Sequence, residues 1–237
     1  MTEHPRRPKL LDDQALHASS VVANCAMNRE RQLAGVNSYT RVLGFDPLAW
    51  LTATPGTDTN TDVGWLDLCC GTGRALVQAA AQVRQDGRLD QVTLVGVDLL
   101  DAFAPAPPLP GLTLTAAPVE TWTPTRTFDL ITCVHGLHYV GDKLAVLTRA
   151  ARWLTPTGRF VADLDLASIR LADGRPAGRH LTAQLRAAGL VYDARRHRIS
   201  CTGPRELHLP YTYLGADDHA GANYTGQPAV HSQYQLA

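Results

Sequence analysis

The stretch Trp65–Leu76, WLDLCCGTGRAL, decides the fold of this 237-residue chain. Its first half, up to Cys70, is mostly apolar and has the length of a buried strand. A Gly-Thr-Gly turn follows at 71–73, and the residues from Arg74 onward are strong helix formers. A strand, a glycine turn and a helix in this order bring a ligand up to bare backbone amides at a helix N-terminus. The sequence therefore predicts a ligand site at the turn.

Two side chains of this stretch narrow the class of ligand. Leu76 stands where a dinucleotide-binding fold needs a small residue, because helix and strand pack closely there. Asp67, at the end of the predicted strand, would repel a pyrophosphate. A ligand that carries both an ammonium-like cation and a carboxylate fits better, since the acid faces the cation and the helix end faces the carboxylate.

The segment from Asp67 to Gly73, DLCCGTG, resembles motif I of the class I S-adenosylmethionine-dependent methyltransferases. That motif usually has an acidic residue followed by Gly-x-Gly-x-Gly. Cys69 stands at the first glycine position, and we expect its small side chain to preserve the tight approach. The resemblance implies that Asp67, Cys69, Gly71 and Gly73 bind S-adenosyl-L-methionine, whose product is S-adenosyl-L-homocysteine.

The order of predicted elements extends this resemblance from about residue 60 to 215. Apolar or alternating runs predict strands at 64–70, 91–98, 112–117, 128–134, 159–165, 190–201 and 205–214. Helical patterns lie between them at 74–84, 143–154 and 178–188. Four prolines within 102–110 predict that the usual second helix is short or absent. The resemblance implies an α/β fold: a three-layer, Rossmann-like, seven-stranded sheet whose last strand is antiparallel.

Helical patterns also precede the first strand. They predict helices within 9–32, at 36–43 with Asn37 or Ser38 as a cap, and at 46–51 with Asp46 as the cap. We therefore expect an N-terminal helical cap over 1–52, a cofactor-binding domain over 53–215, and a C-terminal tail over 216–237 that has no assigned role but is long enough to fold over the site.

The cap is a candidate lid, because it offers Arg29, Arg31, Tyr39 and Arg41 to a ligand on the domain below it. Tyr39 and Arg41 are assigned to the cofactor site. An ordinary charged helix face is the alternative interpretation of the same residues.

Four further residues are assigned to the cofactor site from their positions after predicted strands. Asp98 ends the second strand, where the resemblance implies a carboxylate on the ribose hydroxyls. A helix cap or a solvated loop acid is the alternative for Asp98. Leu99 follows it, and Cys133 lies at the end of the fourth strand. Val119 comes after the third strand, where adenine is expected, with Glu120 close by.

His135 and His138 are the candidate catalytic residues. They follow the fourth strand directly, and ligands of such sheets bind beyond the carboxyl ends of the strands. Methyl transfer from a sulfonium needs mainly alignment of the reacting atoms. An imidazole suits the general-base role if the acceptor must lose a proton. The alternative is a structural histidine that bonds to a loop carbonyl.

Composition excludes several classes of partner. The chain has 22 Lys and Arg residues against 22 Asp and Glu, so it lacks the basic surplus of a nucleic-acid binder. The Cys-Val-His-Gly sequence at 133–136 also differs from the Asn/Asp-Pro-Pro-Tyr/Phe motif of enzymes that methylate nucleic-acid bases. Five cysteines without a C-x-x-C pair predict reduced thiols in a cytoplasmic protein and no metal site. No stretch approaches the roughly 20 apolar residues of a membrane span.

The sequence thus predicts a methyltransferase that acts on an oxygen or nitrogen atom of a small molecule, and we expect this molecule to be a specialised metabolite. Two alternatives stay open at this stage. One is an NAD(P)-dependent reductase on a similar sheet, against which Asp67 and Leu76 argue. The other is a non-catalytic methyltransferase-like partner subunit. A homodimer is also left open.

Overall fold

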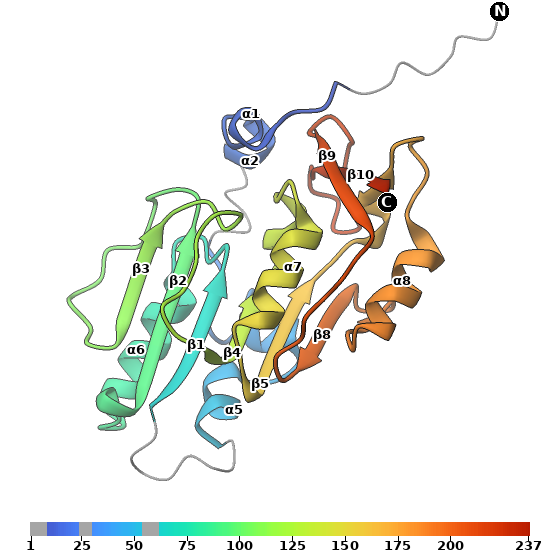
Figure 1. Ribbon diagram of the computed structural model, residues 1–237. Coiled ribbons are helices and arrows are strands. Elements are labelled where there is room, and N and C mark those ends of the chain that lie inside the picture. Colours follow the sequence, from blue (N-terminus) through green and yellow to red (C-terminus); the bar gives the residue numbers. More distant parts are fainter. Residues whose placement is uncertain (1–8, 24–29, 54–61) are drawn as a thin grey trace, which may run out of the picture.

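The computed structural model describes residues 9–23, 30–53 and 62–237. A seven-stranded sheet in the order β3-β2-β1-β4-β5-β8-β7 forms its centre (Figure 1). The strands are Val63–Leu68 (β1), Val92–Asp98 (β2), Leu112–Ala116 (β3), Phe128–Cys133 (β4), Leu154–Asp163 (β5), Val191–Asp193 (β7) and Arg198–Thr202 (β8). Strands β1 to β5 run parallel, and β8 is antiparallel to both of its neighbours. This is the Rossmann-like arrangement that the sequence predicts.

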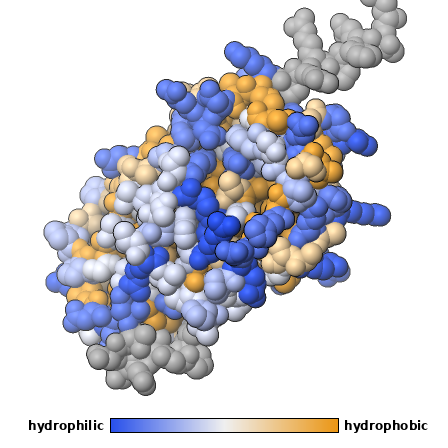
Figure 2. Space-filling view, in the orientation of Figure 1, coloured by the Kyte–Doolittle hydropathy of each residue, from blue (hydrophilic) through white to orange (hydrophobic). Residues whose placement is uncertain are grey.

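Helices cover both faces of this sheet and complete three layers (Figure 1). The helices are Tyr39–Leu43 (α4), Pro47–Ala53 (α5) and Arg74–Gln85 (α6) on one face, and Lys143–Arg152 (α7) and Gly178–Ala187 (α8) on the other. Alternate residues of a strand point to opposite faces, so each strand supplies two apolar cores. Leu66 and Ile131 pack toward α7 and α8, whereas Trp65 and Leu130 pack toward α5 and α6. On the face that carries α7, polar and apolar residues are intermixed at the surface (Figure 2).

A second sheet, with strand order β6-β10-β9, lies near the end of the main sheet toward which the parallel strands point (Figure 1). Its strands are Ile169–Leu171 (β6), Tyr211–Asp217 (β9) and His231–Leu236 (β10). Two short helices, Asp13–His17 (α1) and Ser20–Ala23 (α2), pack against it through an apolar cluster that joins Leu16 and Val22 to Ala216 and Val230. The segment 11–22 and the strands of the second sheet therefore form one unit.

The predicted caps before the first strand are confirmed, although the helix expected at 36–43 begins only at Tyr39. The Ser38 hydroxyl accepts a hydrogen bond from the Arg41 amide at 3.2 Å and caps α4. The Asp46 carboxylate accepts from the Leu48 and Ala49 amides at 2.9 and 3.0 Å and caps α5. The proline-rich segment 99–111 contains neither helix nor strand, as its prolines predict.

The C-terminal strand predictions are wrong in detail. The segment predicted as one strand, 190–201, is a hairpin of β7 and β8, because the Asp193 carboxylate accepts from the Arg195 and Arg196 amides and turns the chain. The segment predicted at 205–214 forms β9 only from Tyr211, and β9 belongs to the second sheet. The tail supplies β10, the middle strand of that sheet.

Two other boundaries differ from the expectation. Strand β5 begins at Leu154 rather than at residue 159, because a shift of register against β4 lets it continue through the predicted turn. The helix expected within 9–32 is interrupted: α1 and α2 are separate, and Gln32 forms an isolated bridge with Ser38. Residues 24–29, and with them Arg29, lie outside the described residues. Every helix in the described ranges is too short or too polar to cross a bilayer.

Candidate active site

A pocket with about 570 Å³ of empty space, part of it open to solvent, lies beyond the carboxyl ends of β1, β2, β3 and β4. Chain segments that follow four neighbouring strands therefore converge on it. Six of the residues singled out in the sequence line this pocket: Cys69, Gly71, Asp98, Leu99, Val119 and His135.

The turn after β1 has the left-handed backbone conformation that its glycines predict. Gly71 and Gly73 have φ values of 62° and 68°, and Cys69 has a φ of 57°. This left-handed conformation costs roughly 1–2 kcal/mol for a residue with a Cβ. It also gives a physical reason for the glycine that motif I usually has at the position of Cys69. Gly73 lies beneath the turn at the start of α6, where an added Cβ would come within 2.8 Å of the Leu114 side chain.

Asp98 ties the end of β2 to this turn. Its carboxylate accepts hydrogen bonds from the Gly71 amide at 2.8 Å and from the Leu100 amide at 3.2 Å. The residue is 8% exposed and lines the pocket. The carboxylate is thus held in place by two backbone donors beside the turn that the ligand is expected to approach.

Asp67 lies beneath the turn and does not line the pocket. It is fully buried, and its carboxylate accepts hydrogen bonds from the Tyr39 and Thr132 hydroxyls, each at 2.6 Å. Burial raises its pKa to about 7. Tyr39 in turn packs edge-on against Trp65, with ring centroids 6.0 Å apart. Asp67 and Tyr39 therefore join the cap to β1, and Thr132, which the sequence did not single out, completes this buried group.

The two candidate catalytic histidines are adjacent. His135 Nδ1 lies 3.4 Å from His138 Nε2. The His135 amide donates to Asp163 Oδ2 at 3.1 Å, and its Nε2 lies 3.9 Å from the same oxygen. His135 lines the pocket, whereas His138 lies behind it and is 1% exposed. Within the described part of the chain, His138 Nδ1 has no hydrogen-bond partner.

Burial sets the protonation of both rings. It lowers the pKa of His135 to about 4, with Arg31 adding to the effect. It lowers the pKa of His138 to about 3, with His135 as the next cause. Burial also raises the pKa of Asp163 to about 6. At pH 7 both imidazoles are neutral, so each ring keeps one nitrogen lone pair that can accept a proton or a hydrogen bond.

Two further residues predicted for the cofactor site lie away from the pocket. Cys133 is fully buried at the end of β4, and its sulfur lies 2.9 Å from the place that a Cβ on Gly136 would take. Arg41 is exposed on α4, and its guanidinium donates to the Val36 carbonyl at 3.4 Å. Their roles as cofactor contacts stay predictions.

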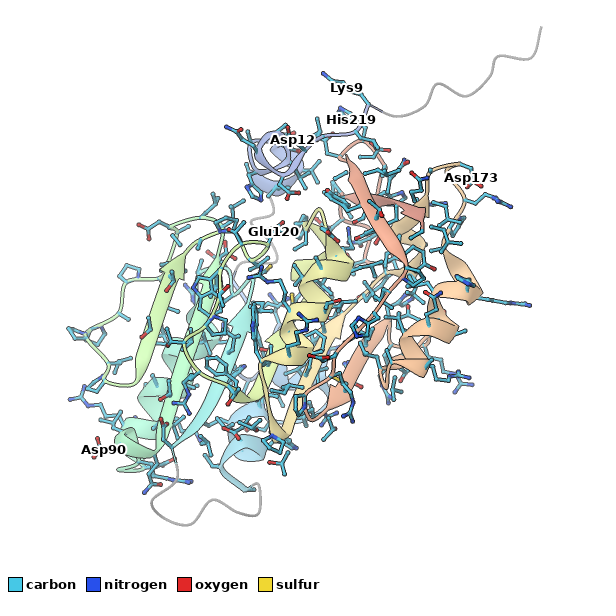
Figure 3. The ribbon with its side chains drawn as sticks, in the orientation of Figure 1. Lys9, Asp12, Asp90, Glu120, Asp173 and His219 are labelled. Carbon is cyan, nitrogen blue, oxygen red and sulfur yellow. The ribbon has the colours of Figure 1, made fainter. Side chains whose placement is uncertain are left out.

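The roof of the pocket comes from residues that the sequence did not assign to the site. His17 and Val22 of the cap lie across from Glu120, Tyr139 and Val140. His17 Nε2 is 3.6 Å from Glu120 Oε2. Glu120 lies below α1 and α2, near the end of the sheet where the parallel strands finish (Figure 3). The position of Glu120 directly after β3 could have identified it as a site residue from the sequence. His17, in contrast, reaches the pocket only because its helix packs on the second sheet.

Asp163 was also missed as a site residue. It ends β5 in the way that Asp98 ends β2, so the same reasoning from strand ends would have found it. The described residues contain no group of three His, Cys, Asp or Glu side chains arranged to hold a metal ion.

A family model described as "Methyltransferase domain" matches residues 36–208, most of the chain. Similar solved structures include the plantazolicin methyltransferase BpumL in complex with a pentazolic desmethylPZN analog and SAH. It has 15% identity and a TM-score of 0.44, over 63% of this chain and 55% of that chain. The N-methyltransferase NodS from Bradyrhizobium japonicum WM9 in complex with S-adenosyl-L-homocysteine has 14% identity and a TM-score of 0.44, over 82% and 98%. No curated protein matches the sequence significantly.

Proposed function

Because the chain belongs to the methyltransferase domain family, we propose that it transfers a methyl group from S-adenosylmethionine to an oxygen or nitrogen atom of a small molecule. The observation that carries the proposal is the joint position of Gly71 and Asp98 in one pocket, where a positive-φ turn and a carboxylate held by its amide lie side by side. When bound, the cofactor supplies a methyl group already activated on a sulfonium.

The lining of the pocket fits each part of this cofactor. The Asp98 carboxylate has acceptor capacity for the ribose hydroxyls beyond its two amide contacts. Leu99 and Val119 offer apolar surface to the adenine ring, and Glu120 offers an acceptor for its amino group. The bare backbone at Gly71 allows close approach. Through His17 and Val22, the cap covers these groups, which supports the prediction that residues 1–52 form a lid.

On the acceptor side, His135 is the group best placed to contact the nucleophile, because it lines the pocket. Its pKa of about 4 makes the ring neutral at pH 7 and a weak base. Such an imidazole can accept a hydrogen bond and orient the acceptor, but it removes a proton from an aliphatic alcohol poorly. This favours an acceptor that is already nucleophilic, such as a neutral amine or an acidic hydroxyl.

The decisive experiment titrates the protein with S-adenosylhomocysteine by calorimetry and, separately, with NADH by fluorescence transfer. We expect S-adenosylhomocysteine to bind and NADH not to bind. Binding of NADH alone would overturn the proposal in favour of a reductase. Incubation with S-adenosylmethionine and a panel of small amines and phenols then measures turnover; cofactor binding without any turnover would favour a partner subunit.

A further inference from the structure

A stacked pair of rings stands behind the candidate catalytic histidines. Tyr224, in the loop between β9 and β10, lies parallel to the His197 ring, with centroids 3.9 Å apart and planes 7° apart. The same tyrosine meets His138 edge-on, with centroids 5.3 Å apart. The Tyr224 ring thus occupies a slot between His197 and His138, and His138 in turn contacts His135, which lines the pocket.

His197, which forms one side of this slot, is firmly held. His197 lies in the turn between β7 and β8, and its carbonyl accepts a hydrogen bond from the Leu164 amide at 2.7 Å, just past the end of β5. Its Nδ1 lies 3.5 Å from the Tyr192 hydroxyl. The ring is therefore displayed from the edge of the main sheet, with both its backbone and its side chain in contact with that sheet.

The ring of Tyr224 is held differently. It projects from a small turn whose hydrogen bonds close within the loop itself: Asn223 binds the amides of Thr225 and Gly226 and donates to the Gln227 carbonyl. Gly221 and Gly226 flank this turn with φ values of 95° and 80°. Tyr224 is 39% exposed. Its aromatic contacts with the body of the protein are the stack on His197 and the edge contact with His138.

We propose that the slot between His197 and His138 is the acceptor site, that it takes a planar aromatic acceptor, and that this acceptor stacks on His197 in place of the Tyr224 ring. The exchange costs little, because one aromatic stack replaces another. It would place the acceptor against His138, whose Nε2 lies 3.4 Å from Nδ1 of the pocket residue His135. This inference rests on the proposed methyltransferase function and specifies the substrate class of the same site.

The test compares 2-naphthol with its saturated analogue, decahydro-2-naphthol, because the two share a carbon skeleton and a hydroxyl but differ in flatness. Dissociation constants are measured by ligand-observed NMR, with and without S-adenosylhomocysteine. We expect the wild type to bind 2-naphthol at least about tenfold more tightly than the saturated compound. Equal affinity for the two compounds, or no binding of 2-naphthol, would overturn the inference.

Variants test the exchange of rings. Tyr224→Ala removes the competing ring, so it should tighten 2-naphthol binding by about two- to tenfold, the equilibrium equivalent of one stack. His197→Ala removes the platform and should weaken binding by a similar factor. Tyr211→Ala is the matched control, since Tyr211 makes an edge contact with His180 on another part of the molecule; it should leave binding unchanged.

The outcomes separate the two proposals. If S-adenosylhomocysteine binds but Tyr224→Ala weakens 2-naphthol binding, or His197→Ala has no effect, the ring-exchange inference fails and the methyltransferase proposal stands. If S-adenosylhomocysteine does not bind while the naphthol series behaves as expected, the methyltransferase proposal fails and the slot remains a site for flat ligands.

Discussion

The two sides of the candidate site are built in different ways. The proposed cofactor side, with Cys69, Gly71 and Asp98, comes from one continuous turn and the end of the neighbouring strand, joined by a 2.8 Å hydrogen bond from the Gly71 amide to the Asp98 carboxylate. The proposed acceptor side consists of the rings of His135, His138, His197 and Tyr224, which come from the loop after β4, a hairpin turn at the sheet edge and the loop between β9 and β10.

This difference predicts how each side responds to change. On the cofactor side the ligand must come close to the backbone, and an added side chain blocks this approach. Substitutions there should therefore have a strong effect on cofactor binding. On the acceptor side each ring contact adds a separate and modest amount to the free energy of binding. Each substitution there should therefore change the affinity for the acceptor only modestly.

Gly71→Val should abolish binding of S-adenosylhomocysteine, because a branched side chain would stand in the pocket at a position with a φ of 62°. Gly87→Val is the matched control: Gly87 has a φ of 68°, and an added Cβ there has no atom within 4 Å. Both variants carry a similar backbone strain of roughly 1–2 kcal/mol. Calorimetry should show loss of binding only for Gly71→Val. Equal binding by the two variants would remove the turn from the cofactor site.

Asp98→Ala should weaken S-adenosylhomocysteine binding by about 1.5–3 kcal/mol, the usual loss for a hydrogen bond to a charged group. The substitution also leaves the Gly71 amide without its acceptor, so the turn itself loses a support. Asp101→Ala, on an exposed residue three positions further on, serves as the control. Titration of both variants checks the prediction. An unchanged affinity for Asp98→Ala would mean that the carboxylate acts only on the fold.

The contrast between the two sides also explains what the sequence predicted. The cofactor side depends on neighbours in the chain: the strand end, the turn and the start of α6 lie within Trp65–Leu76, and Asp98 ends the next strand. Local patterns of this kind are enough to predict the turn and the acid that line this part of the pocket. The caps at Ser38 and Asp46 were predictable for the same reason, since each acts on amides within three residues.

The acceptor side depends on contacts between distant segments, which no local pattern reports. Tyr224 meets His197 only because β10 pairs with β6 and β9 in a second sheet, and the sequence placed β9 in the main sheet instead. The hairpin at Asp193 was missed because its turn is closed by a side chain within an apparently continuous β-prone run. His17 reached the pocket through the packing of Leu16 on that second sheet.

The neutral imidazoles of the acceptor side predict a stability that depends on pH. The pKa of His138 is about 3 in the folded protein and ordinarily 6.5, so the unfolded chain takes up a proton first as the pH falls. Between pH 7 and pH 5, this residue should therefore remove about 2 kcal/mol from the free energy of unfolding. Asp67 and Asp163 act in the opposite sense, because burial raises their pKa values to about 7 and 6.

A difference measurement isolates the histidine from those carboxyls. Urea unfolding of the wild type and of His138→Gln is compared at pH 7 and pH 5. The stability advantage of the wild type should shrink by about 2 kcal/mol on acidification. His219→Gln changes a histidine whose side chain is 93% exposed, and it should show no such shift. A constant advantage at both pH values would indicate that His138 is not held neutral by burial.

Cys69 gives the smallest effect and the sharpest test of how the cofactor side is built. Its backbone has a φ of 57°, at the position where motif I usually has glycine. Cys69→Gly removes the left-handed strain and the thiol together, whereas Cys69→Ala removes the thiol and keeps the strain. The difference in stability between the two variants therefore measures the strain, and glycine should be the more stable by about 1 kcal/mol, after its greater freedom in the unfolded chain is counted.

The affinity of the two variants for S-adenosylhomocysteine distinguishes this strain from a direct contact between the Cys69 sulfur and the ligand. If the backbone alone forms the cofactor side, both variants should bind S-adenosylhomocysteine within about twofold of the wild type, because neither adds atoms to the pocket. If both bind more weakly by the same factor, the thiol itself contacts the ligand. If alanine is as stable as glycine, the turn carries no strain at this position, and Cys69 is then a side-chain contact that replaces the glycine rather than a tolerated substitute for it.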